Sequence, residues 1–166
     1  MIIEINIPEG IQITIQKNIL TVKGPKGETT KEFKAKGLNM ELKDKTLFVE
    51  YTSKPMGKTL KTLIENMIHG VQEPYVKNLI IRYHHFPITV ELKGKELTIK
   101  NFIGERYPRK CKVHGDVKVD IKGQNITLTS CDKYAIGQTA ASLKKITRSK
   151  LDERVFQDGI YDVIEE

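Results

Sequence analysis

The amino-acid sequence predicts an α+β fold made of two tandem, duplicated domains, each with antiparallel β-strands packed against one α-helix around a single core. Three observations support this prediction. The chain repeats itself at a constant spacing, each repeat changes from an alternating to a helical pattern of apolar residues, and 166 residues suit two small domains. We expect a first domain over residues 1–79 and a second over residues 80–166.

The repeat emerges when the chain is aligned with itself. Three segments of the first half match segments of the second half at a separation of 77 residues, and two more match at 79. The first three pairs are residues 11–15 with 88–92, 20–23 with 97–100, and 27–28 with 104–105; the other two are 38–42 with 117–121 and 47–49 with 126–128. A twofold repeat describes architecture and does not by itself give a function.

Apolar and polar residues alternate in these paired segments, as they do in half-buried antiparallel strands. Turn residues separate the segments, for example at Lys93-Gly94-Lys95, and the short spacing predicts hairpins. We expect four strands followed by one helix in each domain. Residues 75–86 should form a strand and a link between the domains.

Each predicted helix is indicated by apolar residues spaced three and four apart. Ser53 and Pro55 mark the start of the first helix and Gly70 its end, while Asp132 is a candidate cap for the second. The inward-facing residues are Leu60, Leu63, Ile64, Met67 and Ile68 in the first helix, and Ile136, Ala140, Leu143 and Ile146 in the second.

Composition argues against several classes of protein. No apolar run approaches the roughly 20 residues that cross a bilayer. The first residues lack the pattern of a secretory signal peptide, so we expect a cytoplasmic protein. Cys111 and Cys131 are the only cysteines, and Cys111 with His114 has no second ligand pair at zinc-site spacing. We expect free thiols, no metal and no cofactor.

The net charge of +7 is unevenly distributed along the chain. All five arginines lie in the second half, and residues 100–150 hold 12 basic and 4 acidic side chains. The guanidinium group presents a planar fork of donors that suits phosphate. A basic stretch concentrated in one half is typical of a nucleic-acid-binding protein, although an ordinary soluble surface rich in lysine is the alternative.

Residues 101–110 combine a glycine, two aromatic residues and three cations in one predicted loop. Aromatic rings can stack on unpaired bases while Arg and Lys bind phosphates. The alternative is that Phe102 and Tyr107 close the edge of the domain. The candidate RNA-binding residues in and beside this loop are Asn101, Phe102, Gly104, Arg106, Tyr107, Arg109, Lys110 and Lys112.

The second predicted helix and the residues after it form another candidate RNA-binding region. The run Gly137-Gln138-Thr139-Ala140-Ala141 is small enough for close approach of a backbone, and a basic stretch follows it. A tightly packed helix with a solvated charged face is an equally good interpretation. The candidate residues here are Gln138, Lys144, Lys145, Arg148 and Lys150, with Arg154 and Tyr161 in a tail that we expect to form an extended arm.

No motif in the sequence indicates catalysis. Gly24-Pro25-Lys26-Gly27 lacks the Lys-Ser/Thr of a phosphate loop; a hairpin turn is the favoured interpretation, and direct RNA contact is the alternative. His84 and His85 are adjacent, so on a strand they point to opposite faces and do not easily share a site. We expect them to pack in the core or at the interface between the domains. The chain is predicted not to be an enzyme.

Seven short motifs, in this order and across a duplicated frame, resemble large-subunit ribosomal protein six of the universal nomenclature, number nine in eukaryotic naming. They are Ile7-Pro8-Glu9-Gly10, Val22-Lys23-Gly24-Pro25-Lys26-Gly27, Asn66-Met67-Ile68-His69-Gly70-Val71, His85-Phe86-Pro87-Ile88, Asn101-Phe102-Ile103-Gly104-Glu105, Gly137-Gln138-Thr139-Ala140-Ala141 and Phe156-Gln157-Asp158-Gly159-Ile160-Tyr161. The last motif is similar to the archaeal and eukaryotic branch. The resemblance covers nearly the whole chain.

This resemblance implies a structural constituent of the large ribosomal subunit. It implies binding to large-subunit rRNA near the sarcin–ricin loop and the factor-binding face, mainly through the second domain. The first domain would then be scaffold. The implied partners are large-subunit rRNA and neighbouring ribosomal proteins near the stalk base, with no membrane and no small-molecule substrate.

Two other functions compete with rRNA binding. A protein–protein adaptor could use exposed sheet edges without binding RNA. A small enzyme using His84, His85 or Cys111 would need a concave site with convergent polar groups.

Overall fold

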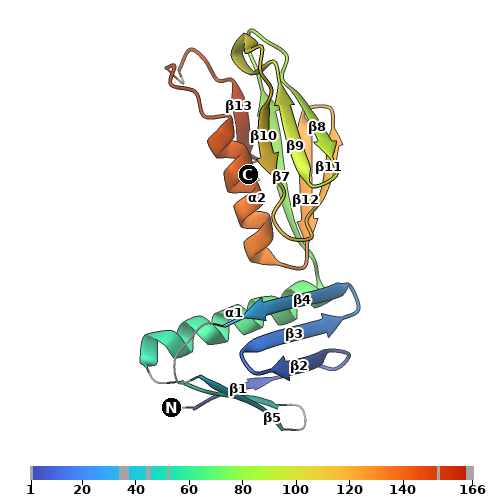
Figure 1. Ribbon diagram of the computed structural model, residues 1–166, viewed down its shortest axis with the longest axis vertical. Helices are drawn as coiled ribbons and strands as arrows, with labels where there is room; N and C mark the ends of the chain where they lie inside the picture. Colours follow the sequence, from blue (N-terminus) through green and yellow to red (C-terminus); the bar gives the residue numbers. More distant parts are fainter. Residues whose placement is uncertain (1, 34–37, 44–45, 52, 153, 164–166) are drawn as a thin grey trace. The chain divides into compact units, whose positions relative to one another are not determined.

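The protein is described by a computed structural model that covers residues 2–33, 38–43, 46–51, 53–152 and 154–163. Contacts between residues divide the chain into two compact units, which are described separately. The first unit contains residues 1–74 and 131–133, and the second contains 75–130 and 134–166. Figure 1 shows both units and labels most of their elements.

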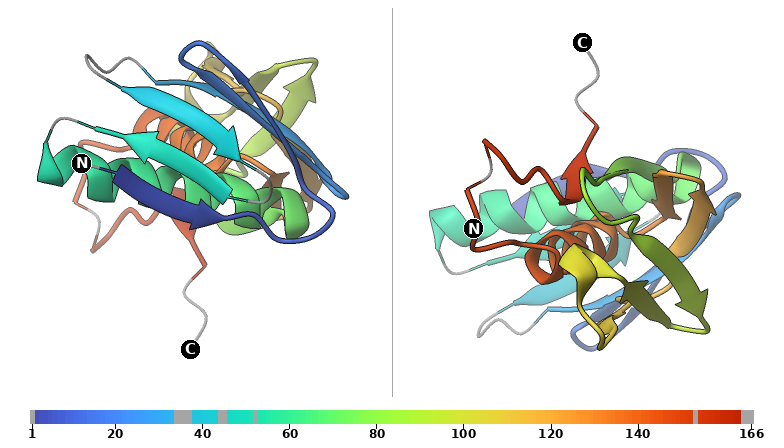
Figure 2. Two further views of the ribbon diagram at one scale, coloured as in Figure 1. Left: turned by 90° about the horizontal axis from the view of Figure 1, so that it is seen from below. Right: turned by 90° about the horizontal axis from the view of Figure 1, so that it is seen from above.

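The first unit contains two antiparallel sheets and one helix. One sheet has the order β1 (Ile2–Asn6), β6 (Thr46–Glu50), β5 (Asn39–Lys43), and the other has the order β2 (Gln12–Gln16), β3 (Ile19–Gly24), β4 (Gly27–Glu32). Helix α1 (Lys54–Gln72) packs against β1, β3 and β4, so it contacts both sheets. The views in Figure 2 show this green helix running along the strands.

The core of the first unit lies between α1 and the two sheets. Alternation along β3 buries Leu20 and Val22, while Ile64 and Val71 on α1 face the same cluster. Burying each such aliphatic side chain stabilises the fold by about 1.5–3 kcal/mol relative to leaving it exposed. The apolar faces of strands and helix therefore hold this unit together.

The second unit has the same plan with one additional strand. One sheet has the order β10 (Arg109–Lys112), β9 (Glu96–Lys100), β8 (Thr89–Lys93). The other has the order β11 (Lys118–Lys122), β12 (Asn125–Ser130), β7 (Tyr75–Arg82), β13 (Gly159–Asp162), again antiparallel throughout. Helix α2 (Lys133–Ile146) contributes Ile136, Ala140 and Leu143 to the core, together with Leu97 of β9 and Leu128 of β12.

The two units confirm the predicted duplication. Strands β2, β3, β5 and β6 correspond to β8, β9, β11 and β12, and the order β1–β6–β5 recurs as β7–β12–β11. In each unit the sheets approach each other through equivalent strands, β2 with β5 and β8 with β11. The prediction of an α+β fold from two tandem copies, each with its own core and helix, is therefore confirmed.

The expected count of four strands per copy is wrong. Each copy also has a further edge strand, β4 or β10, and the first copy begins with the unpredicted strand β1, whereas β7 confirms the strand expected within residues 75–86. Strand β7 pairs along its length with β12 and β13. The structure thus divides the units between Pro74 and Tyr75, whereas a boundary between residues 79 and 80 would cut β7.

Two element ends also differ from the prediction. Helix α1 continues through Gly70 to Gln72, because Gly70 is buried on the core side rather than forming a terminating turn. The predicted extended arm is in part a strand, because β13 adds to the edge of β7 and pairs Tyr161 with Ile80. Among the described residues, neither helix is both long and apolar enough to cross a membrane.

Candidate nucleic-acid interface

The two units differ most in the connection after their third strand. In the first unit, β3 and β4 are joined by a tight turn in which Gly24 pairs with Gly27. In the second unit, the connection between β9 and β10 spans residues 101–108 and includes a short 3-10 turn at Phe102–Gly104. The extra length lies within the predicted RNA-binding loop. The repeat therefore departs from symmetry where the basic and aromatic residues cluster.

Three of the first four residues of this loop have left-handed backbone conformations. Asn101 has φ 58°, Ile103 has φ 51° and Gly104 has φ 73°. Glycine adopts this region without steric cost, but a β-branched residue such as Ile103 is a true outlier there. Strained residues of this kind persist where the surroundings hold them, and they cluster at functional sites. The backbone of this loop is therefore held in one defined conformation.

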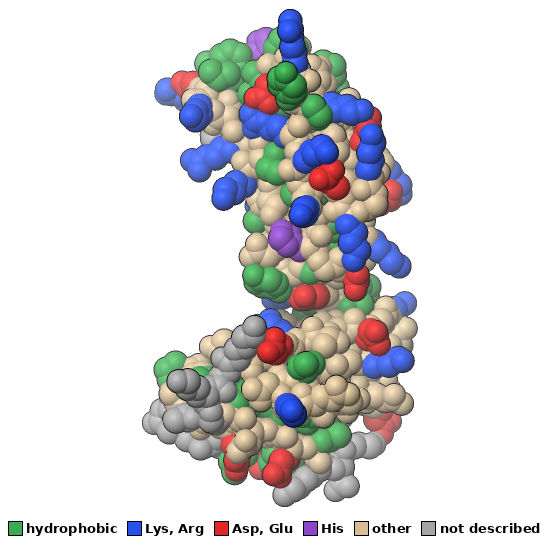
Figure 3. Space-filling model, viewed as in Figure 1, with side chains coloured by type: hydrophobic (Ala, Val, Ile, Leu, Met, Phe, Trp, Pro, Cys, Tyr) green, Lys and Arg blue, Asp and Glu red, His purple; other side chains and the backbone are tan. Residues whose placement is uncertain are grey.

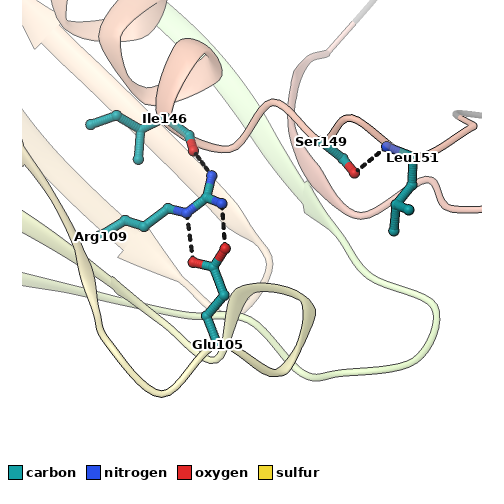
Figure 4. Close-up of polar contacts among 5 residues, drawn as sticks. All are labelled: Glu105, Arg109, Ile146, Ser149 and Leu151. Carbon is teal, nitrogen blue, oxygen red and sulfur yellow. Dashed lines mark hydrogen bonds and ion pairs between the residues drawn. The ribbon is translucent and has the colours of Figure 1, made fainter.

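Arg109 holds the loop against the end of α2 (Figure 4). Its guanidinium group donates two hydrogen bonds to the Glu105 carboxylate, one of them from Nε at 2.7 Å, and a third to the carbonyl oxygen of Ile146. It also lies 4.4 Å from the centre of the Phe102 ring. Ile146 ends α2, so its carbonyl has no partner within the helix. One side chain thus joins the loop, a helix end and the core.

The contact with Arg109 favours the ionised form of the Glu105 carboxyl. The hydrogen bond from Arg109 lowers the pKa of the Glu105 carboxyl below its ordinary value. The acid is then neutralised by a guanidinium that it contacts directly. Glu105 consequently adds little net negative charge to a surface that we expect to meet phosphates.

This geometry argues against direct RNA contact by two of the predicted residues. The Phe102 side chain is 1% exposed and belongs to the core, so its ring cannot stack on a base in this conformation. The donors of Arg109 are directed at Glu105 and Ile146, so this residue positions the loop instead of presenting a free fork to phosphate. The alternative that Phe102 closes the edge of the domain is the one that its burial supports.

Other residues of the same loop remain on the surface. Tyr107 is 87% exposed, and Arg106 beside it is exposed with no ion pair among the described residues. Lys112 is exposed as well, and Lys110 forms an exposed ion pair with Glu96 at 3.3 Å. An exposed ion pair of this kind contributes little free energy, so the lysine can easily exchange its partner. Arg106 and Tyr107 therefore form the accessible tip of the loop.

The basic residues of α2 and the segment after it fall into two groups. Lys145, Arg148 and Lys150 are exposed and form no ion pair with any described residue. Lys144 instead pairs with Asp162 of β13, which also contacts Lys77 of β7 at 3.2 Å. Lys144 is therefore engaged in attaching β13 to its neighbours.

The remaining residues predicted to bind RNA are not among the exposed cations without an ion pair to a described residue. Gln138 is half-buried on α2, and Asn101 donates from Nδ2 to the Pro87 carbonyl at 3.1 Å. Arg154 makes two hydrogen bonds to the Asp152 carboxylate, although its own side chain is 89% exposed. Tyr161 is half-buried within β13 instead of lying on a free arm.

The structure brings the loop tip and the end of α2 to one end of the second unit, because Arg109 links them. Among the described residues, the cations here without an ion pair include Arg106, Lys145, Arg148 and Lys150, while the acids Glu105 and Asp152 are paired with arginines. In the view of Figure 3, Lys and Arg side chains gather over the second unit. Such a surface would attract a polyanion.

The two adjacent histidines do not pack in the core of the second unit. His84 and His85 are exposed at this same end of the second unit, so the expectation of core packing is wrong. The His84 amide donates to the buried Asp158 carboxylate at 2.9 Å, and the His85 ring lies 5.0 Å from the Phe156 ring. The signal available in the sequence was the Pro87 that follows, since proline favours links and turns.

The chemistry of a catalytic site is not assembled around these residues. Cys111 is 4% exposed, and burial raises the pKa of its thiol, which leaves the unreactive protonated form. No group of three or more His, Cys, Asp or Glu side chains within the described ranges could hold a metal ion.

Comparison with known proteins decides the family. The family model described as ribosomal protein L6 matches residues 7–74 and 86–150. This chain belongs to the ribosomal protein L6 family. A protein of Methanobrevibacter smithii named large ribosomal subunit protein uL6 is 41% identical over 98% of this chain and 95% of its own length. Proteins with the same name from Archaeoglobus fulgidus and Haloarcula marismortui are 42% and 36% identical, over 96% of this chain and 87% and 93% of their own lengths.

Membership of the L6 family confirms two predictions. The matched relatives are archaeal, in agreement with the archaeal and eukaryotic branch indicated by the tail motif. The family is structural and non-enzymatic, in agreement with the prediction that the chain does not catalyse a reaction. The two matched segments also coincide with the two copies of the repeat.

Proposed function

We propose that this L6-family protein is a structural constituent of the large subunit of the cytoplasmic ribosome and that its second unit binds large-subunit rRNA. The observation that supports this proposal is the set of cations at one end of that unit that form no ion pair with a described residue, where Arg109 links the loop to the end of α2. The named relatives are large ribosomal subunit proteins. The first unit then serves mainly as scaffold, because it has no arginine and a smaller excess of basic residues.

The proposed contact surface is smaller than the sequence alone indicated. It consists of Arg106 and Tyr107 at the loop tip, Lys145 on α2, and Arg148 and Lys150 after the helix, with Lys110 and Lys112 beside them. Cations without an intramolecular partner can release counterions from phosphates when they bind. Arg109, Lys144 and Arg154 already have carboxylate partners, so they contribute to the shape of the surface.

The experiment compares two variants of equal charge. Arg106→Ala/Lys145→Ala/Arg148→Ala removes three cations from the proposed surface, and Lys17→Ala/Lys23→Ala/Lys58→Ala removes three exposed cations from the first unit. Affinity for a large-subunit rRNA fragment is measured from 50 to 300 mM KCl, chosen to span roughly the range where phosphate contacts dominate. We expect the first variant to reduce the salt slope by about 2–3 and to lose affinity.

The first-unit variant should bind rRNA nearly as tightly as the unchanged protein does, because it differs from that protein only in total charge. Equal losses in the two variants would overturn the placement of the surface in the second unit. Affinity that does not change with salt would overturn rRNA binding itself. Retention of protein partners after nuclease treatment, without any RNA binding, would favour the adaptor function instead.

The position within the ribosome is part of the same proposal. We propose a position near the sarcin–ricin loop, the factor-binding face and the proteins of the stalk base, which is what the family resemblance implies. A photoreactive crosslinker at Tyr107, which is almost fully exposed, would identify the neighbouring nucleotides. Crosslinks to rRNA far from this region would contradict the placement.

A further inference from the structure

A group of aromatic rings lies beside the basic loop at the same end of the second unit. The link between β7 and β8 presents His84, His85 and Phe86, and all three are exposed, with Phe86 at 43%. The rings of His84 and His85 are 5.0 Å apart at an interplanar angle of 70°, and the His85 ring lies 5.0 Å from that of half-buried Phe156. We call these four residues the ring cluster.

The link that holds the ring cluster is fixed from both sides. On one side, the amide of His84 donates to Asp158, whose carboxylate is 2% exposed. On the other, the side chain of Asn101 donates to the Pro87 carbonyl, and the Phe86 ring lies directly over Gly104, where an added Cβ would come within 3.3 Å of it. The rings are therefore held in place on the surface at little further entropic cost.

The charges around the ring cluster indicate the kind of partner that it suits. Glu105 is paired with Arg109, Asp152 with Arg154, and Asp158 is buried against the His84 amide. Arg106 follows Gly104 by two residues, which puts it within about 7 Å along the chain. Among the described residues, Arg106 and Arg82 have no ion pair. The exposed rings are thus bordered by cations without an ion pair and by two acids, Glu105 and Asp152, that are paired with arginines, while the Asp158 carboxylate is buried.

We propose that the ring cluster stacks on unpaired bases, so that this end of the protein binds looped or bulged RNA in preference to a continuous duplex. Bases in a duplex are stacked on each other and hide their faces, whereas unpaired bases can be received by aromatic side chains. Arg106 and the end of α2 hold the flanking phosphates. This inference rests on the proposed rRNA binding and specifies its ligand class. An acidic peptide would meet the same cations but would not need the rings.

The test uses three RNA probes and two matched variants of the full chain. The probes are a hairpin with an unpaired purine-rich loop, the same hairpin with abasic loop positions, and a blunt duplex of equal charge. His85→Ala/Phe86→Ala removes two exposed rings, whereas Val76→Ala/Tyr134→Ala truncates two exposed apolar side chains elsewhere on the second unit. Thermal unfolding of each variant checks that the fold is retained.

We expect the ring variant to bind the purine hairpin roughly tenfold or more weakly, in line with the effect of removing a stacking ring. Its salt slope should not change, because no phosphate contact is lost. Binding to the abasic hairpin and the duplex should stay as in the unchanged protein. His85→Tyr/Phe86→Tyr should restore most of the hairpin affinity, which separates stacking from a folding defect.

Each other result counts against the inference. Equal losses on hairpin and duplex, or no loss on either, would overturn base stacking, as would failure of the tyrosine variant to restore affinity. Loss of binding to a polyglutamate peptide with RNA binding intact would assign the rings to an acidic protein. If the unchanged protein bound none of the RNA probes, the proposed function itself would fail, which is a distinct outcome.

Discussion

At the scale of single residues, Arg109 shows how residue type can mislead. An arginine in a basic loop predicts phosphate binding, but in the structure Glu105, Ile146 and Phe102 surround it. The Glu105 partner lies four residues away and could have been suspected. The Ile146 carbonyl could not, because it reaches the loop only through the packing of α2. Arginines that can bind phosphate are therefore distinguished from arginines with intramolecular partners only when the tertiary structure is known.

Replacing Arg109 should affect stability more than replacing its exposed neighbour Lys110. Arg109→Ala leaves Glu105 and the Ile146 carbonyl without their donor, and we expect it to lower the free energy of unfolding by about 1–3 kcal/mol. Lys110→Ala removes only an exposed pair and should change it by less than about 0.5 kcal/mol. Urea unfolding of both variants measures the difference. Equal effects would show that Arg109 does not hold the loop.

Asp162 should give the second unit a stabilisation that depends on pH. Partial burial raises the pKa of its carboxyl, but hydrogen bonds from Lys144 and Lys77 outweigh this and hold the pKa below its ordinary value. Because the pKa is lower in the folded state, the stabilisation is fully present above the unfolded value, near pH 3.9, and is lost as the pH falls through the folded value.

Asp162→Asn tests this ion-pair arrangement. The carboxylate is 40% exposed, so solvent screening limits the expected loss to about 0.5–1 kcal/mol at pH 7. The unchanged protein and the variant should converge in stability as the pH falls toward 2, and also in 1 M salt. Urea unfolding at several pH values measures both trends. A difference that stayed constant down to pH 2 would contradict the ion-pair account.

At the scale of elements, prediction succeeded where an apolar pattern was strong. Strands β2, β3, β8 and β9 alternate clearly and recur at constant spacing, so their existence and pairing could be inferred. Strand β4 has almost no apolar residue and β10 has only Cys111, so these edge strands left no alternating signal. Strand β13 has four residues and depends on pairing with β7, which is remote in sequence. Local pattern could not reveal any of the three.

The two helices offer a matched pair of glycine substitutions. Gly137 on α2 is exposed, and an added Cβ would meet nothing within 4 Å. Gly137→Ala should stabilise the protein by about 0.5–1 kcal/mol through helix propensity. Gly57 on α1 is buried, and its added Cβ would lie 2.5 Å from the Tyr51 ring. Gly57→Ala should destabilise by about 1–3 kcal/mol, despite the same gain in propensity.

Thermal unfolding of both variants checks the opposite signs. A stabilising Gly57→Ala would mean that Tyr51 moves aside without cost. A destabilising Gly137→Ala would mean that this part of α2 approaches another element more closely than the structure shows.

At the scale of the whole molecule, the two copies have similar apolar cores but differ in the charged residues around them. Leu20 and Leu97 occupy equivalent central positions, and each is completely buried in its own cluster. The family and the fold could be inferred from the sequence because the repeat and seven motifs span the chain. The composition of the contact surface could not, because it depends on which cations find carboxylate partners.

Cavity variants at these equivalent positions should separate the roles of the two units. Leu20→Ala and Leu97→Ala should each cost about 2–5 kcal/mol of stability. On warming, Leu97→Ala should lose rRNA affinity at a lower temperature than Leu20→Ala, because the proposed surface is built on the core that contains Leu97. Filter binding at a series of temperatures measures this. Identical temperature profiles would indicate that both cores support the surface equally.

The attachment of β13 to β7 bears on the order in which the chain acquires its structure. Gly159 of β13 pairs with Arg82 of β7, so the sheet of the second unit is complete only when these segments, which are far apart in sequence, meet. Closing so long a loop costs conformational entropy before any contact compensates for it, and non-local pairing slows folding. During synthesis, β7 leaves the ribosome long before its edge partner exists. A newborn chain would therefore expose a bare strand edge in its RNA-binding half until the last part of that half has been made.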